Sequence, residues 1–399
     1  MGRVACTHHS GGMMSRGTEA GLLDQPKPQS VYKHAILDQY AIRFATMTAK
    51  WLRPKRSVLF DGFAGRGRFD NGQAASAEHM MLHAQKMKNS TQIDVFLVEQ
   101  RRADWQRLDE VADEYRARGV NVTTRHGSCE DQLDELYEYA AGASLFLFLD
   151  PCGAVLPFDT LRPLLQKRGD RPRTEFLMNF SADLIRRAGG QYKKGQLELG
   201  GVAQADRVCG GTWWREVALQ AHLSSGGELW ETAAEAVAVE YAKRLIAGTH
   251  FDWAVAPVRR QVHHQPVYFL IFLTSDPHGF WVFGVSAAKA REKWLEFVGP
   301  DEDELEGMLF NTVEDQLERE HAAAIRTITD NLRALCTDGA QHAVVQRWSE
   351  IFGDVYGEAK ETAFTAALRQ LVKDGEIEFV SKGPKPHKHV IKAGPAIKS

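Results

Sequence analysis

The residues whose types and spacing bear most directly on chemistry lie in the segment VLFDGFAGRG, residues 58–67. An apolar run there leads to Asp61 and then to a turn that contains Gly62, Gly65 and Gly67. Glycines allow a tight turn and the close approach of a ligand to the backbone, because they carry no Cβ. In a doubly wound α/β sheet, such a loop at the carboxyl end of the first strand holds a nucleotide-like cofactor. An ordinary strand-loop-helix turn uses glycine in the same way, so the prediction depends on the neighbouring segments.

Two further apolar runs also end in polar groups. Residues 93–98 are followed by Glu99, where such folds place a carboxylate that accepts hydrogen bonds from ribose hydroxyls. Residues 145–149 are followed by Asp150 and Pro151. Since the carboxyl ends of parallel strands meet at one edge of a sheet, we predict that these polar groups lie together. The alternative interpretation of Glu99 is a solvated acid at a strand end.

The charge of the loop narrows the choice of cofactor. The loop lacks the Lys-Ser/Thr of a P-loop, and Glu99 comes later than the roughly 20-residue offset of a dinucleotide-binding fold. Asp61 would repel phosphates, whereas it suits a positively charged ligand. S-adenosylmethionine carries a sulfonium and an ammonium group. We therefore predict this cofactor, with Asp61 facing its methionine end and Glu99 holding its ribose.

The fourth strand of the predicted sheet ends in a candidate catalytic motif. Methyl transfer from a sulfonium requires alignment of the acceptor and exclusion of water more than acid-base help. Amino-methyltransferases that act on DNA or RNA use an Asp/Asn-Pro-Pro-aromatic motif, which accepts a hydrogen bond from the exocyclic amine and stacks the flipped base. This chain has Asp150-Pro151-Cys152-Gly153, so Asp150 and Pro151 are the candidate catalytic residues. Phe158 or Phe180 would have to supply the missing aromatic platform. Without a base beside it, Cys152 is predicted to be a small buried thiol rather than a nucleophile.

The remaining pattern predicts an α/β fold with a parallel sheet and right-handed crossovers. Apolar periodicity predicts helices and strands in alternation, followed by a mainly helical insertion and two antiparallel final strands. The predicted helices are 32–52, 76–87, 102–118 and 129–141; the strands are 95–98, 120–125, 145–149 and 175–180; the insertion is 184–250; the final strands are 253–258 and 267–273.

Residues 318–399 differ in pattern from the rest of the chain. Helices are predicted at 319–336, 343–352 and 358–373, followed by strands at 376–380 and 389–391. Three helices and a hairpin describe a winged-helix domain. The hairpin tip carries Lys382, Lys385 and Lys388, which suits a wing that contacts phosphates of a nucleic acid. The alternative is a solvated loop in a winged helix that docks on protein.

Several segments, taken in order, resemble the three-Cys-motif partner proteins. They are KHAILDQY at 33–40, DGFAGRGRF at 61–69, FLDPCG at 148–153, LMNF at 177–180, GGTWW at 210–214 and YFLIF at 268–272. The similarity covers about residues 30–300, and its specific parts are the glycine loop and the Asp-Pro motif. It implies a Rossmann-like fold similar to class I S-adenosylmethionine-dependent methyltransferases and a cofactor loop that includes Phe63. It also implies a partner with a three-cysteine, radical-enzyme-like motif. The family pattern usually shows Phe where this chain has Cys152.

Composition indicates a cytoplasmic protein of more than one domain. The chain has 399 residues, of which 44% are apolar, enough for two cores. We expect a disordered tail at 1–30, a methyltransferase-like domain at 31–300 and a winged helix at 318–399. A net charge of −3 gives no global basic field, so contact with nucleic acid requires a local patch.

The cysteines and the hydropathy pattern exclude other classes. Five cysteines are scattered without Cys-x-x-Cys spacing, which favours reduced thiols over disulfides. Cys6, His8 and His9 lie in the predicted tail, where we expect no metal site. No apolar run reaches the roughly 18 residues of a membrane span, and no signal peptide is expected at the N-terminus.

Three functions agree with these patterns. The leading one is methylation of a base or nucleotide in nucleic acid, DNA or RNA. The second is a non-catalytic accessory subunit that delivers nucleic acid to a radical-type, three-Cys-motif partner. The third is a nucleotide-dependent enzyme built on the same fold.

Overall fold

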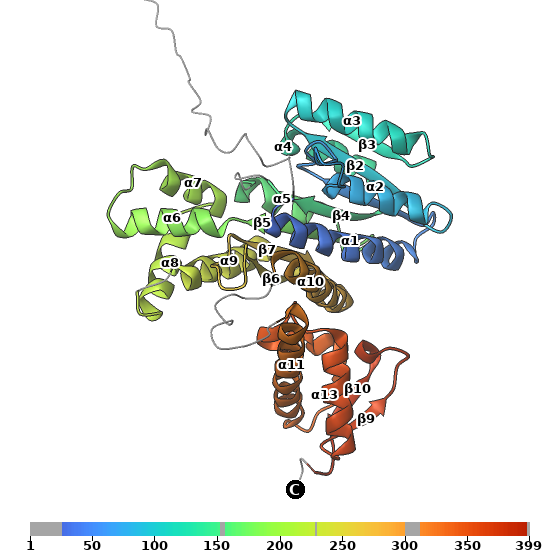
Figure 1. The fold of residues 1–399 in the computed structure, drawn as a ribbon, viewed down its shortest axis with the longest axis vertical. Coiled ribbons are helices and arrows are strands. Elements are labelled where there is room, and N and C mark those ends of the chain that lie inside the picture. Colours follow the sequence, from blue (N-terminus) through green and yellow to red (C-terminus); the bar gives the residue numbers. More distant parts are fainter. Residues whose placement is uncertain (1–25, 152–155, 228–229, 300–311, 397–399) are drawn as a thin grey trace, which may run out of the picture.

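A computed structural model describes residues 26–151, 156–227, 230–299 and 312–396 (Figure 1). Its centre is a seven-stranded sheet of order β3-β2-β1-β4-β5-β7-β6. The strands are β1 (Arg56–Asp61), β2 (Gln92–Glu99), β3 (Val122–His126), β4 (Ser144–Leu149), β5 (Thr174–Phe180), β6 (Asp252–Val258) and β7 (Tyr268–Thr274). β1 to β5 pair in parallel, whereas β7 runs antiparallel to both of its neighbours. This mainly parallel order fits a Rossmann-like methyltransferase fold and confirms the predicted α/β class.

Helices cover both faces of the sheet because its strands are apolar on both sides. In β1, Val58 and Phe60 enter one core and Leu59 enters the other, as alternating side chains of a strand must. One face is covered by α1 (Pro28–Ala49), α2 (Ser76–Met87), α3 (Arg102–Arg116) and α10 (Pro277–Val298). The other is covered by α4 (Cys129–Tyr139), α5 (Phe158–Lys167), α6 (Ala182–Lys193), α7 (Gly200–Cys209), α8 (Trp213–Ser224) and α9 (Glu231–Ile246).

The first helix begins earlier than the pattern predicted. α1 starts at Pro28 rather than at Tyr32, since proline is well suited to the first turn of a helix. The last three residues of the predicted tail at 1–30 therefore belong to this helix. The rest of that prediction, including Cys6, His8 and His9, falls on residues 1–25, which lie outside the described residues. Of the cysteines that the structure describes, Cys129, Cys209 and Cys336 are free and buried.

The C-terminal part consists of three α-helices and a small sheet. Its α-helices are α11 (Val313–Cys336), α12 (Trp348–Phe352) and α13 (Glu361–Lys373), with 3-10 turns η2 (Val344–Arg347), η3 (Gly353–Val355) and η4 (Pro386–Lys388). Its strands are β8 (His342–Ala343), β9 (Ile377–Ser381) and β10 (Val390–Ala393), in the order β8-β10-β9. The predicted helix at 343–352 was therefore wrong in its first half. Pairing with β10 turns His342 and Ala343 into a strand, which two residues cannot signal by periodicity.

Helix α10 joins the two parts, and Figure 1 shows it between the sheet and the C-terminal helices. Its Trp281 belongs to the C-terminal core, with its ring centre 5.0 Å from that of Phe352 and 5.1 Å from that of Phe364. The indole Nε1 of Trp281 donates to Glu361 Oε1 over 2.9 Å. The hydroxyl of Tyr356 donates to the backbone oxygen of Phe280 over 2.7 Å. These contacts dock the C-terminal part firmly against α10.

No helix within the described ranges combines the length and the apolar character needed to cross a lipid bilayer.

The docking of Tyr356 on α10 requires a glycine beneath its ring. A Cβ at Gly284 would lie 2.6 Å from Cε2 of Tyr356. We expect Gly284→Ala to lower the free energy of unfolding by about 1–3 kcal/mol, the usual cost of overpacking a core. Thermal and urea unfolding measure this effect. Gly190→Ala in α6 is the matched control, since a Cβ there meets no atom within 4 Å. Higher helix propensity should stabilise that variant by up to about 1 kcal/mol, so equal stability of the two variants would contradict the prediction.

Candidate functional site

The candidate site lies at the carboxyl edge of the sheet. Because β1, β2, β4 and β5 are parallel, their last residues meet there. This brings Asp61, Glu99, Asp150 and Asn179 to one edge, as the strand pattern predicted for the first three.

Asp61 is fully buried at the end of β1. Its Oδ1 accepts a hydrogen bond from the backbone N–H of Phe63 over 3.0 Å, and its Oδ2 accepts from the Ser76 hydroxyl over 2.6 Å. Burial raises the pKa of Asp61 to about 7, although both hydrogen bonds act in the opposite direction. The carboxylate therefore ties the glycine loop to the first residue of α2. Sequence reasoning missed this role and assigned Asp61 only to the ligand.

The glycines of the loop serve two different purposes. Gly65 and Gly67 have φ angles of 59° and 77°, which glycine adopts without the strain that a side chain would bring. At Gly62 the reason is packing, because a Cβ there would lie 2.5 Å from the Cys129 sulfur of α4. The loop thus turns sharply at its centre and packs closely at its start.

Glu99 connects the loop to the end of β2. Its Oε2 accepts from the backbone N–H of Gly65 over 2.9 Å, and its Oε1 accepts from the N–H of Arg101 over 2.7 Å. Burial raises the pKa of Glu99, while these hydrogen bonds favour its ionised form. An ionised carboxylate offers about four acceptor positions, so two remain for a ligand.

Asp150 is held by an ion pair at the end of β4. Lys33 of α1 donates to its Oδ2, and the side-chain amide of Asn179 donates to its Oδ1 over 2.9 Å. Burial alone would raise the pKa of Asp150, but the Lys33 charge and both hydrogen bonds outweigh it and place the pKa below the usual range. Lys33 also lies 4.9 Å from the ring centre of Tyr268. Asp150 is therefore ionised and oriented. Sequence reasoning assigned no role to Lys33, and no local pattern signals a contact across 117 residues.

The surroundings of Asp150 correct one expectation. Phe180 is 1% exposed, and its ring centre lies 4.9 Å from that of Tyr241 in the core, so it cannot serve as a stacking platform. Phe158 lies 5.8 Å from the same Tyr241 ring and packs against that core. Pro151 follows Asp150 directly, whereas Cys152 and the glycine after it lie outside the described residues.

The lysines at the predicted wing point to a second candidate site. Lys382, Lys385 and Lys388 are exposed, and the Lys382 ammonium lies 4.6 Å from the ring centre of Phe379. One side chain of the tip is buried: His387 is 9% exposed, and its ring centre lies 5.8 Å from that of Trp281. This contact fixes the tip against α10.

Lys360, directly before α13, forms an ion pair with Glu292 of α10, so its charge is compensated within the protein. Among the described residues, no group of three or more His, Cys, Asp and Glu side chains has an arrangement that could hold a metal ion.

The buried carboxylate of Asp61 makes stability depend on pH. Its pKa in the folded protein, about 7, exceeds its ordinary value of 3.8, so the folded state binds this proton more tightly. The resulting stabilisation is complete below pH 3.8 and is lost as pH rises through 7. We expect the melting temperature of Asp61→Asn to rise relative to wild type between about pH 5 and pH 8, with a free-energy change on the order of 4 kcal/mol at most. Asp113→Asn on the exposed side of α3 should follow wild type. A pH-independent difference between wild type and Asp61→Asn would refute the assignment.

Among known proteins, this chain is similar to solved structures alone. No protein-family model and no curated protein matches the chain. The plantazolicin methyltransferase BamL, crystallised with S-adenosylhomocysteine, is 10% identical, with a TM-score of 0.31 over 62% of this chain and 84% of its own. An rRNA methylase from Streptococcus thermophilus is 10% identical, with a TM-score of 0.27 over 58% and 92%. Precorrin-6y C5,15-methyltransferase from Geobacter metallireducens is 14% identical, with a TM-score of 0.27 over 58% and 86%. These scores describe a partial overlap, so the fold assignment rests on the strand order and directions given above.

Proposed function

We propose that this protein binds S-adenosylmethionine at the carboxyl edge of its sheet and transfers a methyl group to an amine of a nucleic acid. The observation that carries the proposal is the hydrogen bond between Glu99 and Gly65, at the same edge of the sheet as the ionised Asp150. This hydrogen bond holds the Glu99 carboxylate, which has free acceptor positions, against the glycine loop. A ligand can approach the backbone of that loop closely, because its glycines carry no Cβ.

The residues of the loop fit this cofactor in distinct ways. Glu99 would accept hydrogen bonds from the ribose hydroxyls through its two remaining acceptor positions. Gly62, Phe63, Gly65 and Gly67 would form the wall beside the cofactor, with the Phe63 amide fixed by Asp61. In its ionised form, Asp61 would act on the positive methionine end through its charge rather than by contact, since its side chain is fully buried. When bound, the cofactor supplies an electrophilic methyl group.

Asp150 would bind the acceptor. As an ionised carboxylate it can only accept hydrogen bonds, and it would orient an amine by accepting a hydrogen bond from one of its N–H groups. Lys33 and Asn179 would keep the carboxylate in one orientation. Pro151 would restrict the backbone after it, because its ring fixes φ.

A second candidate function is an accessory subunit of a three-Cys-motif, radical-enzyme-like partner, as the resemblance to the partner family implies. One observation favours it: Asp61 and Asp150 are each satisfied by two contacts within the chain. A site whose acids are satisfied within the chain can persist without catalysis. Binding of S-adenosylmethionine without methyl transfer to any nucleic acid would favour this function.

For the domains, we propose a methyltransferase-like unit at 31–300 with its helical insertion at 184–250, and a winged helix at 318–399. The three helices α11, α12 and α13 and the sheet β8-β10-β9 support the winged helix. The exposed Lys382, Lys385 and Lys388 would then touch the phosphate backbone.

Substitutions at Glu99 and Asp150 separate cofactor binding from catalysis. Glu99→Gln should weaken S-adenosylmethionine binding about tenfold or more, because hydrogen bonds to a charged group contribute about 1.5–3 kcal/mol. Asp150→Asn should bind the cofactor like wild type and lose methyl transfer to nucleic acid. Titration calorimetry and transfer of a labelled methyl group measure the two effects. The exposed Glu110→Gln is the matched control. Wild-type cofactor affinity in Glu99→Gln would contradict the assignment of the loop.

The wing is tested by removing its charge. Replacing Lys382, Lys385 and Lys388 with Ala should leave folding intact, since all three are exposed. Affinity for nucleic acid should fall by a similar factor for every sequence, and the slope of log affinity against log salt should shrink by up to about three for duplex DNA. Unaltered affinity and slope would instead indicate a module that docks on protein.

A further inference from the structure

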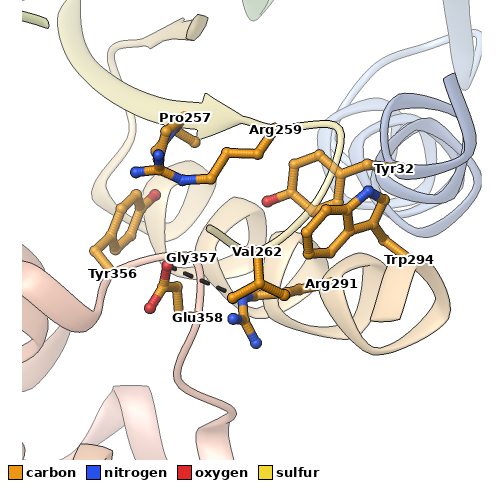
Figure 2. Close-up of a pocket in the computed structure, with 10 residues that line it drawn as sticks. Tyr32, Pro257, Arg259, Val262, Arg291, Trp294, Tyr356, Gly357 and Glu358 are labelled. Atoms are coloured by element: carbon orange, nitrogen blue, oxygen red, sulfur yellow. Dashed lines mark ion pairs between the residues drawn. The ribbon is translucent and has the colours of Figure 1, made fainter. Parts of the chain in front are cut away.

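A cavity of about 330 Å³ lies between the sheet and the C-terminal helices (Figure 2). Its walls come from the start of α1, the end of β6 and the turn after it, the last turns of α10, and the segment between η3 and α13. Its volume falls within the range of about 300–1,000 Å³ that is usual for small-molecule sites. It contains no residue of the glycine loop and no Asp150.

Aromatic rings form two sides of this cavity. Figure 2 shows Tyr32 and Trp294 on one side and Tyr356 on the other. Tyr32 and Trp294 meet edge to face, with ring centres 6.4 Å apart. Tyr356 is fixed by its hydrogen bond to Phe280 and by the Trp348 ring at 4.6 Å. The rings are therefore preformed, and they suit a planar ligand, because such ligands stack on aromatic faces.

One guanidinium of the cavity has unused donors. Nη1 of Arg259 donates to Glu231 over 2.8 Å and to the backbone oxygen of His264 over 2.9 Å. Its Nε and Nη2 make no hydrogen bond to any residue that the structure describes, and the side chain is about one-third exposed. Arg291, by contrast, donates from both terminal nitrogens to Glu320. Arg259 is thus the donor that a ligand can use.

Glu358 supplies the matching acceptor at the rim. Its Oε1 lies 3.9 Å from Nε of Arg291, too far for a hydrogen bond, and its carboxylate accepts none from the described residues. Its side chain is 54% exposed. In Figure 2 the Glu358 carboxylate and the Arg259 guanidinium lie on the same side of the cavity as Tyr356, one below its ring and one above it. A donor and an acceptor thus stand at the same wall of the cavity, opposite Tyr32 and Trp294.

These charges select the class of ligand. Glu358 opposes an anion, and the two arginines oppose a cation. A neutral planar ring can satisfy both residues when one of its edges carries N–H donors for Glu358 and another carries carbonyl or ring-nitrogen acceptors for Arg259. We propose that the cavity binds a guanine base, whose N1–H and N2 amine would donate to Glu358 and whose O6 and N7 would accept from Arg259. The base can come from a free nucleoside or from an unpaired guanine in a strand, and neither source requires S-adenosylmethionine.

Calorimetry with the full chain tests the proposal. We expect guanosine to bind at least tenfold more tightly than adenosine, because adenine N1 would place an acceptor against the Glu358 carboxylate. A uridine oligonucleotide with one central guanine, compared with an all-uridine oligonucleotide, shows whether the base is read within a strand. Binding of guanosine indicates a nucleoside site, whereas binding of the guanine oligonucleotide alone indicates a strand. The proposal is wrong if neither probe binds at millimolar concentration.

Two variants link that binding to the cavity. Glu358→Gln should weaken the binding of guanosine, or of the guanine oligonucleotide, about tenfold or more, since it removes a charged acceptor. Arg259→Lys should also weaken it, because lysine lacks the planar pair of donors. The exposed Glu318→Gln is the control. S-adenosylmethionine binding should be unchanged in Glu358→Gln, which separates this site from the glycine loop. Equal affinity for guanosine and adenosine, or wild-type guanine affinity in Glu358→Gln, would overturn the proposal.

Discussion

The burial of the parallel sheet on both faces is the constraint on which the structure depends. Its central strands β1, β2, β4, β5 and β7 have no solvent-exposed face, so polar groups that must meet a ligand stand at their ends. Asp61, Glu99 and Asp150 occupy three such ends at the same edge. The sheet therefore brings the candidate chemistry together at one edge.

A buried carboxylate needs hydrogen bonds or an opposite charge to replace the water that it loses. Asp61, Asp150 and Glu175 obtain them from different partners. Asp61 uses a backbone N–H and a hydroxyl, and burial still raises its pKa to about 7. Asp150 has a lysine partner, and its pKa lies below the usual range. Glu175, buried within β5, accepts from the hydroxyls of Tyr40 and Thr274, and burial raises its pKa to about 7 as well. Of these three acids, Asp150 has the cationic partner and is held firmly in the ionised form, which suits a group that accepts a hydrogen bond from an amine.

Helix α10 imposes a second constraint. It buries Phe280 and Phe283 against the sheet, and Trp281 and Val285 against the C-terminal core. A helix that is apolar on most sides is stable only when it is enclosed. The C-terminal part therefore buries the apolar side of α10 that faces away from the sheet. The cavity lined by Trp294 and Tyr356 lies where the C-terminal part meets the sheet.

The sequence by itself determined the sheet and its acidic edge, because apolar runs and the acids that follow them are local patterns. The ends of β1, β2 and β4 and the α/β class were predictable for that reason. Tertiary structure alone decided the pairing of Lys33 with Asp150, the strand β8 and the cavity beside Arg259. It also gave Asp61 its anchoring contact with Ser76. These features join residues that are separated in the chain, and only the packing of helices and the pairing of strands bring such residues together.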